Sequence, residues 1–439
     1  MSGQGLAAAH TLPAASPVAL PWRAGLRYGA LGAPLAFAAL PLYVLLPNHY
    51  AAQLGVPLAG LGAVLLGSRA LDALVDPALG RWVDHGLAQP RQRVLGWASL
   101  AALLMALGFA ALFFPPAGSS RQLLAWCAAA LVLTSLGYSA LGVLHQAWGA
   151  RLGGTAAQQA RIVSWREGMA LAGVLGASVL PALAGIPLMV ATCVLLLVLG
   201  LWALRFAPFR SAPPRLLRPA SAGGWRSWAL PWRVDAFRRL MQVFVLNGVA
   251  SAIPATLLLF FIRDRLQAPA WEPLFLGGYF LAAGLSMPLW VRAVVRWGLV
   301  RCWLAGMGLA VAAFIWAARL GAGDGPAFVA ICLATGAALG ADLAIPGALL
   351  AGVIARAGHA LRHEGSYFGW WTCANKLNLA LAAGLALPAL QWLGYTPGAS
   401  NPQALSVLAQ LYAGLPCLLK LAAAGLLWRH RRHLERAWL

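Results

Sequence analysis

The sequence predicts an all-α membrane protein whose twelve transmembrane helices form two pseudo-symmetric halves of six. Of its 439 residues, 61% are hydrophobic and only 10% are charged, whereas soluble chains carry about 25% charged residues. Apolar stretches of about 20 residues, the length that crosses ~30 Å of hydrocarbon, recur along the chain. A segment rich in Pro, Arg and Ser interrupts them near the middle. These three observations define the fold class.

The apolar stretches divide evenly around the central segment. We expect passes near 28–47, 58–80, 94–114, 122–147, 167–184 and 186–205, then near 239–262, 273–295, 300–319, 326–355, 367–394 and 403–428. Only a turn around Gly185 separates the fifth pass from the sixth. The predicted parts are a flexible cytoplasmic N-terminal tail (1–27), a first half (28–205), a basic cytoplasmic linker (206–238), a second half (239–428) and a cytoplasmic C-terminal tail (429–439).

The basic residues predict the orientation. The chain carries a net charge of +21, but its arginines recur in short groups between apolar stretches. We therefore expect a lipid bilayer, and not a nucleic acid, as the partner of these charges. With the N-terminus inside, 25 Lys and Arg residues fall on the cytoplasmic side and 4 on the other. This imbalance predicts cytoplasmic termini in a bacterial-type inner membrane.

Three ionisable residues of the second pass share one helical face. Arg69, Asp72 and Asp76 are three and four residues apart. Asp72 precedes Arg81 by nine residues, which places it roughly 13 Å into the membrane at about 1.5 Å per residue. Two carboxylates this close in a low dielectric must share a proton, bind a cation or contact a positive group. We predict a cation-coupling site here; the alternative is a packing salt bridge between Arg69 and one aspartate.

Two lysines also lie inside passes. Lys376 of the eleventh pass has the same estimated depth as Asp72, so we predict that it is a partner of the aspartate pair. The alternative pairs Lys376 with a local carbonyl or with Asp342 of the tenth pass. Lys420 has no acidic residue nearby in sequence, and we interpret it as structural or as a misplaced pass boundary.

Weaker candidates for substrate binding or gating are polar or aromatic residues within or beside the passes. They are Arg69, Arg166, Tyr28, Trp370, Trp371 and Asp342. Arg166 with Glu167 is either a cytoplasmic gate pair or a solvated helix start, and Asp342 has either a packing or a site role. Trp and Tyr rings stack on sugars but also serve as packing residues and interface anchors. His145 and the six cysteines are interpreted as packing residues.

The second-pass string RALDALVDPALGRWVD resembles the signature of the glycoside-pentoside-hexuronide:cation symporters, the melibiose-permease branch of the major facilitator superfamily. The matching residues are Arg69, Asp72, Asp76, Pro77, Gly80 and Asp84. The likeness extends to YGALG at 28–32, SWREGMALAG at 164–173 and EGSYFGWWTCANKL at 364–377. The resemblance implies the major facilitator fold with alternating access. It also implies a coupling cation at Asp72 and Asp76, with Lys376 beside it and Arg166 near the sugar.

The sequence also departs from that family. The first and fourth passes carry no acidic residue, so we do not expect carboxylates to hold a galactoside as in melibiose-type members. Val75 stands where sodium-using members have an Asn, which favours a proton over sodium as the coupling ion. Sodium at Asp72 and Asp76 stays the alternative, with Thr134 or Ser135 supplying the missing oxygen. The acidic run after the tenth helix is replaced by a basic one, so gating on that side is expected to differ.

We therefore expect a secondary active transporter that moves a sugar or related small polar solute by cation-coupled symport. The alternative is a transporter of the same fold for a lipid-like or amphipathic solute, because the first and fourth passes are apolar. The sequence holds no HExxH, Walker motif or nucleophile–base set, so we do not expect an enzyme. We expect no cofactor and a monomeric protein.

Overall fold

The computed structural model describes residues 20–210, 229–396, 398 and 400–435. The described residues form helices and no strand. Parts of the two predicted tails (1–19 and 436–439) and most of the predicted linker (211–228) lie outside the described residues.

The first half contains the first six passes. Its elements are α1 (Trp22–Gly29), α2 (Gly32–Leu40), η1 (Pro41–Leu45), α3 (Leu46–Asn48), η2 (His49–Gln53), α4 (Leu58–Leu87), α5 (Arg91–Phe113), α6 (Ser120–Arg151) and α7 (Ala156–Leu204). The first pass runs from α1 to η2 and is interrupted at prolines, which cannot donate a helical hydrogen bond. α7 contains two passes, because Gly185 adopts φ 76° and reverses the chain between them.

The second half repeats this arrangement. Its elements are η5 (Pro231–Arg233), α8 (Asp235–Phe260), η6 (Phe261–Arg265), η7 (Pro269–Trp271), α9 (Glu272–Phe314), η8 (Ile315–Arg319), α10 (Gly325–Arg356), α11 (Glu364–Trp392), α12 (Pro402–Ala409), η9 (Gln410–Gly414) and α13 (Leu415–Glu435). α9 also contains two passes, separated at Gly298 with φ 77°. The last pass runs from α12 to α13. The predicted twelve-helix fold in two halves is thus confirmed.

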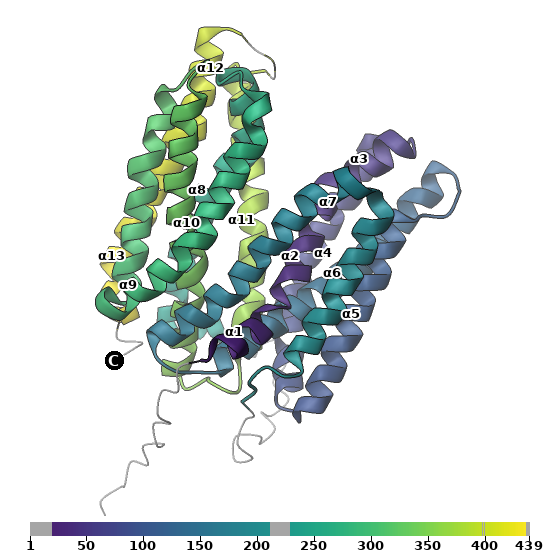
Figure 1. The fold of residues 1–439 in the computed structure, drawn as a ribbon, viewed down its shortest axis with the longest axis vertical. Coiled ribbons are helices and arrows are strands. Elements are labelled where there is room, and N and C mark those ends of the chain that lie inside the picture. Colours follow the sequence, from purple (N-terminus) through teal and green to yellow (C-terminus); the bar gives the residue numbers. More distant parts are fainter. Residues whose placement is uncertain (1–19, 211–228, 397, 399, 436–439) are drawn as a thin grey trace, which may run out of the picture.

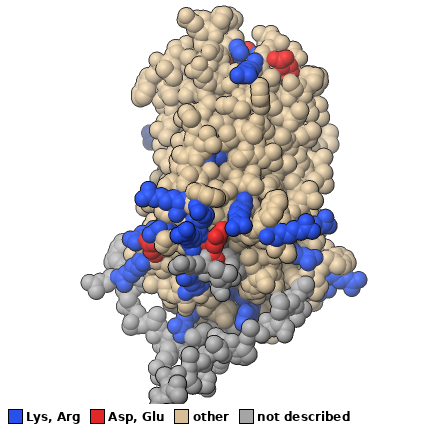
Figure 2. Space-filling model, turned by 90° about the vertical axis from the view of Figure 1, so that its left-hand side faces the viewer, with Lys and Arg blue, Asp and Glu red and all other residues tan. Residues whose placement is uncertain are grey.

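Several helices extend beyond the predicted passes at one end of the molecule. α4 continues to Leu87, and α7 begins at Ala156 rather than near 167. Arginines gather at this end, as Figure 2 shows in blue toward its lower side. We call it the basic end; the helix termini and turns here carry Arg23, Arg81, Arg91, Arg93, Arg151, Arg233, Arg292, Arg301, Arg356 and Arg429. Charged helix extensions of this kind lie outside the hydrocarbon layer.

Large apolar side chains cover the outer surface between the two ends. Leu74, Leu183, Leu285 and Trp392 are among the most exposed hydrophobic residues. Eight stretches of described helix are long and apolar enough to cross a membrane. An apolar surface of this extent faces lipid, and the chain is an integral multi-pass membrane protein.

The two halves meet at the basic end and lean apart toward the opposite end (Figure 1). α4 of the first half packs along α11 of the second, and α7 packs against α9 and α10. This arrangement brings the second and eleventh passes together, and with them the charged residues that the sequence places at similar depth.

Candidate functional site

Glycines set the close approach of α4 and α11. A Cβ added to Gly80 would lie 2.2 Å from the carbonyl oxygen of Gly365, and one added to Gly369 would lie 2.6 Å from the carbonyl oxygen of Asp76. A larger residue at either glycine would separate the two backbones. The contact therefore brings α11 against the face of α4 that carries Asp72 and Asp76.

Lys376 of α11 lies between the two α4 carboxylates. Its Nζ is 3.0 Å from Asp76 Oδ1 and 3.5 Å from Asp72 Oδ2. The same ammonium donates a hydrogen bond of 2.7 Å to the Ser139 hydroxyl of α6. One positive charge from the second half is thus shared by two negative charges of the first half. We refer to Asp72, Asp76, Ser139 and Lys376 as the coupling cluster.

The two carboxylates differ in their surroundings. The Asp76 side chain is 0% exposed, and its Oδ2 has no hydrogen-bond partner among the described residues. Asp72 is 15% exposed and lines a small pocket of about 30 Å³ together with Ser68, Ser135 and Tyr138. A buried carboxylate oxygen without a partner is costly. Asp76 is therefore a residue that can take up a proton.

Beside the coupling cluster is a cavity of about 300 Å³ between the two halves. We call it the central cavity. Its first-half wall includes Ser139, Gln146 and Arg166, and its second-half wall includes Thr372 and Asn375. Gln146 Nε2 donates to the Thr372 hydroxyl at 3.3 Å, so the two walls touch. Ser139 belongs to both the cavity wall and the coupling cluster, and it connects them.

Arg166 and Glu167 form an ion pair at the central cavity. Arg166 donates to Glu167 Oε1 at 2.6 Å and 3.0 Å, and both side chains line the cavity. The pair is far along α7 from its start at Ala156, so the interpretation as a solvated helix start is wrong. Both groups remain partly exposed, at 12% and 22%, and are available to a polar solute.

The predicted aromatic candidates lie in different places. Trp371 lines the central cavity, but Phe244 is stacked on it with ring centroids 3.6 Å apart, which leaves one ring face for a solute. Trp370 packs edge-on against Trp232. Tyr28 is buried and donates its hydroxyl to the His145 carbonyl. Neither Trp370 nor Tyr28 is among the described residues that line the cavity.

Asp342 pairs with Lys420, and not with Lys376. Lys420 Nζ lies 2.7 Å from Asp342 Oδ2, and Trp303 Nε1 donates to Asp342 Oδ1 at 2.7 Å. Lys420, interpreted as structural or as a misplaced pass boundary because no acidic residue is nearby in sequence, thus has an acidic partner on another helix. Distance along the chain hides this partner, because Asp342 lies near the middle of α10 and Lys420 near the middle of the last pass, 402–435. Estimated depth in the membrane predicted that Lys376 is a partner of the aspartate pair. The same criterion would also have paired Lys420 with Asp342.

Polar contacts close the basic end. Arg151 of α6 forms a buried ion pair with Glu364 of α11 at 3.0 Å. Asp84 of α4 accepts hydrogen bonds from the backbone N–H groups of Gly365 and Ser366, at 2.6 Å and 2.9 Å. These N–H groups belong to the first turn of α11, where a negative charge is favoured by the helix dipole. We refer to these contacts as the basic-end gate.

The loop before α11 adds two histidines beside this gate. Partial burial, with smaller effects from His359 and Arg362, lowers the pKa of His363 to about 4. Burial likewise lowers the pKa of His359, whose ring bonds the Tyr367 hydroxyl at 2.7 Å. Both rings are therefore neutral at pH 7.

The described residues provide few ligands for a metal ion. No group of three or more His, Cys, Asp or Glu side chains that could hold a metal occurs among them. Of the two hydroxyls considered for sodium, Thr134 donates to the Ala130 carbonyl of its own helix, whereas Ser135 lines the small pocket with Asp72. The Arg69 side chain lies outside the described parts of the chain.

Several residues of the site were missed by the sequence analysis. Ser139, Gln146, Thr372 and Asn375 are uncharged polar residues of the fourth and eleventh passes. They carry no charge, and charge was the property that singled out the predicted candidates of these passes. Their signal is the presence of polar side chains within apolar stretches, at the depth of the aspartate pair.

A family model described as MFS/sugar transport protein matches residues 25–431. No curated protein matches the chain in a sequence comparison.

Solved structures share the fold. A bacterial homologue of the iron transporter ferroportin in an outward-facing state has a TM-score of 0.67 and 18% identity, over 93% of this chain and 99% of that one. A variant of the fucose:proton symporter FucP of E. coli has a TM-score of 0.64 and 14% identity, over 92% and 99%. The human organic anion transporter MFSD10 (TETRAN) has a TM-score of 0.61 and 20% identity, over 91% and 99%. At these identities the likeness concerns the fold alone.

Proposed function

The chain belongs to the MFS/sugar transport protein family, and from this premise we propose that it is a cation-coupled symporter of a sugar or related small polar solute. It is a multi-pass membrane transporter of the major facilitator superfamily, whose members are not enzymes. The proposal adds the solute class, the coupling and the branch of the superfamily, which is that of the glycoside-pentoside-hexuronide:cation symporters.

The observation that carries the proposal is the position of Lys376 between Asp72 and Asp76. This contact joins the two halves beside the central cavity. A proton taken up by Asp76 would cancel one of the charges that hold Lys376, and would weaken the link between the halves. Occupation of the site by an ion is thereby tied to the relative movement of the halves, which is the requirement for coupled transport.

The central cavity favours a polar solute over a lipid-like one. Gln146, Thr372 and Asn375 offer neutral donors and acceptors, and the Arg166–Glu167 pair offers charged ones. Hydroxyl groups of a sugar match such a mixture. The family model that matches the chain is described as MFS/sugar transport protein, which agrees with this solute class.

The orientation follows from the charges. We place the basic end, with both termini, in the cytoplasm of a bacterial-type inner membrane. The basic-end gate then closes the cytoplasmic side, and the described conformation opens away from the cytoplasm. The coupling ion is a proton, because Asp76 has a buried oxygen without a partner and sodium would need several oxygen ligands. The working unit is the monomer.

The test is uptake by purified protein in proteoliposomes. A panel of radiolabelled monosaccharides, disaccharides, hexuronates and one lysophospholipid is offered under an imposed pH gradient, under a sodium gradient and under neither. We expect accumulation of one or a few sugars that requires the pH gradient and not sodium. Accumulation that requires sodium would reject the proton. Accumulation of a lysophospholipid instead of any sugar would reject the solute class.

A further inference from the structure

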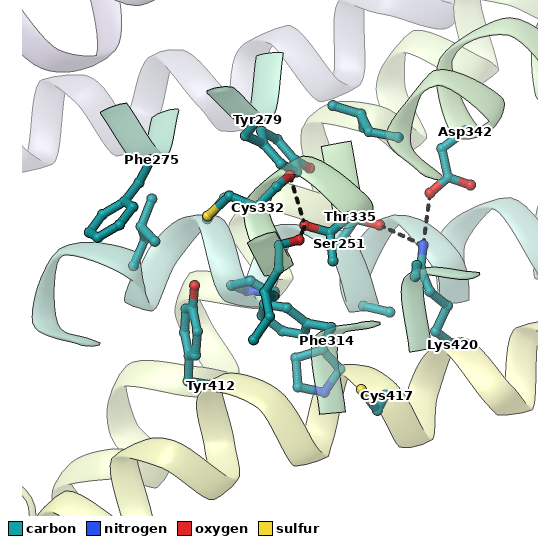
Figure 3. Close-up of a pocket in the computed structure, with 18 of the residues that line it drawn as sticks. Ser251, Phe275, Tyr279, Phe314, Cys332, Thr335, Asp342, Tyr412, Cys417 and Lys420 are labelled. Atoms are coloured by element: carbon teal, nitrogen blue, oxygen red, sulfur yellow. Dashed lines mark hydrogen bonds and ion pairs between the residues drawn. The ribbon is translucent and has the colours of Figure 1, made fainter. Parts of the chain in front are cut away.

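A second pocket lies entirely within the second half, between α8, α9, α10 and α13 (Figure 3). Its volume is about 210 Å³. Asp342 lines both this pocket and the central cavity, and it is the only residue among the described ones that does so. We call this space the second-half pocket. It contains none of the residues of the coupling cluster.

Aromatic rings form the pocket's apolar wall. Phe275 and Phe328 pack edge to face with centroids 4.8 Å apart, and Phe314 packs on Tyr412 at 5.1 Å. Packed rings have little freedom to swing inward and fill the space. The pocket is therefore pre-formed, as ligand pockets usually are.

Two phenol hydroxyls in this wall have no partner. Tyr412 is only 2% exposed, and Figure 3 shows its hydroxyl directed toward the pocket. Neither the Tyr412 nor the Tyr279 hydroxyl makes a hydrogen bond with the described part of the chain. Both residues line the pocket, and a hydroxyl that faces a cavity without a protein partner is free to bond a molecule in it. Their positions point to a guest with a hydrogen-bonding group.

The charged end of the pocket is already satisfied. Lys420 uses its three N–H donors on Asp342 at 2.7 Å, Asn247 at 2.9 Å and Ser251 at 3.2 Å. Asp342 accepts from Lys420 and also from Asn247 and Trp303. An anionic guest would have to displace Asp342 from Lys420, and a cationic guest would face the Lys420 ammonium. A neutral guest meets neither penalty.

We propose that the second-half pocket is a separate binding site for an uncharged, mainly apolar small molecule with one or two hydrogen-bonding groups. The apolar body lies against the Phe275, Phe314 and Phe328 rings, and the polar group bonds the Tyr412 and Tyr279 hydroxyls. The site is distinct from the sugar and proton sites proposed above and does not depend on them.

Three probes of one shape and different charge test the proposal. Tryptophol is neutral, indole-3-acetate is an anion and tryptamine is a cation, and each carries the same ring with a short polar arm. Binding of each radiolabelled probe to the purified full chain in detergent is measured by equilibrium dialysis, with protein-free micelles subtracted. We expect saturable binding of tryptophol at one site per chain, at least tenfold tighter than that of the other two. Equal binding of all three, or no saturable binding of tryptophol, would overturn the proposal.

Two variants locate the site. Tyr412→Phe removes only the hydroxyl and should weaken tryptophol binding about fivefold. Val311→Trp adds a ring to the pocket wall and should abolish binding. The matched control is Tyr50→Phe, which removes the hydroxyl of a buried tyrosine in the first half, outside the pocket, and should leave the affinity unchanged. Unchanged affinity in Tyr412→Phe, or an equal loss in Tyr50→Phe, would show that tryptophol binds elsewhere and would overturn the proposal.

Discussion

Asp76 combines complete burial with one unpaired carboxylate oxygen. If this oxygen takes up the coupling proton, Asp76→Asn should reduce gradient-driven solute accumulation to the level of protein-free liposomes. The amide is similar in size, so the variant should still fold and insert. We expect the same loss from Asp72→Asn. The measurement is uptake in proteoliposomes under a fixed pH gradient.

The control for the aspartate variants is Asp235→Asn. Asp235 is also paired with arginines, but it is 49% exposed at the start of α8, and its loss should leave accumulation near the wild-type level. Wild-type accumulation by both Asp72→Asn and Asp76→Asn would refute the assignment of the coupling cluster.

Lys376 supplies the positive charge that both carboxylates share. Lys376→Met keeps most of the side-chain length but leaves two negative charges facing each other. Because a proton then relieves their repulsion, the carboxylates hold it to higher pH, and the pH optimum of transport should move upward. Lys420→Met removes the other buried lysine, which lies outside the coupling cluster. The shift should be absent in that variant, and an unchanged pH profile in Lys376→Met would assign Lys376 to packing.

His363 predicts a pH dependence of stability outside the membrane. Its pKa is about 4 in the folded protein and about 6.5 in an unfolded chain. As pH falls from about 6.5 to about 4, the unfolded chain binds the proton more readily, so the free energy of unfolding falls. His363→Gln should make this fall less steep, as measured by thermal unfolding at pH 7, 5.5 and 4. Identical slopes in the variant and the wild type would contradict the prediction.

The contact of α4 and α11 depends on glycines. A Cβ at Gly80 would meet the Gly365 carbonyl at 2.2 Å, so Gly80→Ala should force the helices apart at a cost of about 1–3 kcal/mol. We expect a lower thermal unfolding temperature and a longer distance between spin labels placed on the basic ends of α4 and α11. Gly96→Ala in α5 is the control, because its Cβ would meet nothing within 4 Å.

Much of this element-level structure could be predicted from the sequence. The length of apolar stretches predicts twelve passes, because hydrocarbon thickness sets the length of each helix. The spacing of Asp72 and Asp76 predicts their common face, because α-helical geometry is local. The extra turns of α4 and α7 at the basic end could not be predicted, since polar residues outside the membrane extend a helix without an apolar signal.

Contacts between distant passes were predictable only where depth was considered. Lys376 and the aspartates lie at similar depth, and the structure places them within 3.5 Å. Lys420 and Asp342 are 78 residues apart in sequence, and no local pattern joins them. Gln146 and Asn375 line the same cavity only because of the way the two halves pack together. That packing results from many weak contacts, which no local sequence pattern reveals.

The linker predicted at 206–238 is expected to act as a tether between the two halves. Its composition, rich in Pro, Arg, Ser and Gly, does not sustain a packed core. Cutting the chain within 211–228 and co-expressing the two halves should therefore retain at least part of the transport activity. Loss of assembly would mean that the linker makes specific contacts.

The cut avoids the described ends of the linker, which do pack. Arg91 donates to the Arg205 and Ala207 carbonyls, and Trp148 Nε1 donates to the Pro208 carbonyl at 2.7 Å. A control cut at Gly358 divides the strongly packed second half between α10 and α11, next to the basic-end gate. We expect that cut to abolish transport.

The one-residue turns at Gly185 and Gly298 bear on how the protein is made. Each turn is so short that the two passes it joins must enter the bilayer together. Three arginines, Arg292, Arg296 and Arg301, flank the Gly298 turn, whereas the Gly185 turn lies within an apolar stretch. During synthesis the eighth and ninth passes should therefore insert as one hairpin whose basic turn is never translocated, while the Gly185 hairpin crosses turn first.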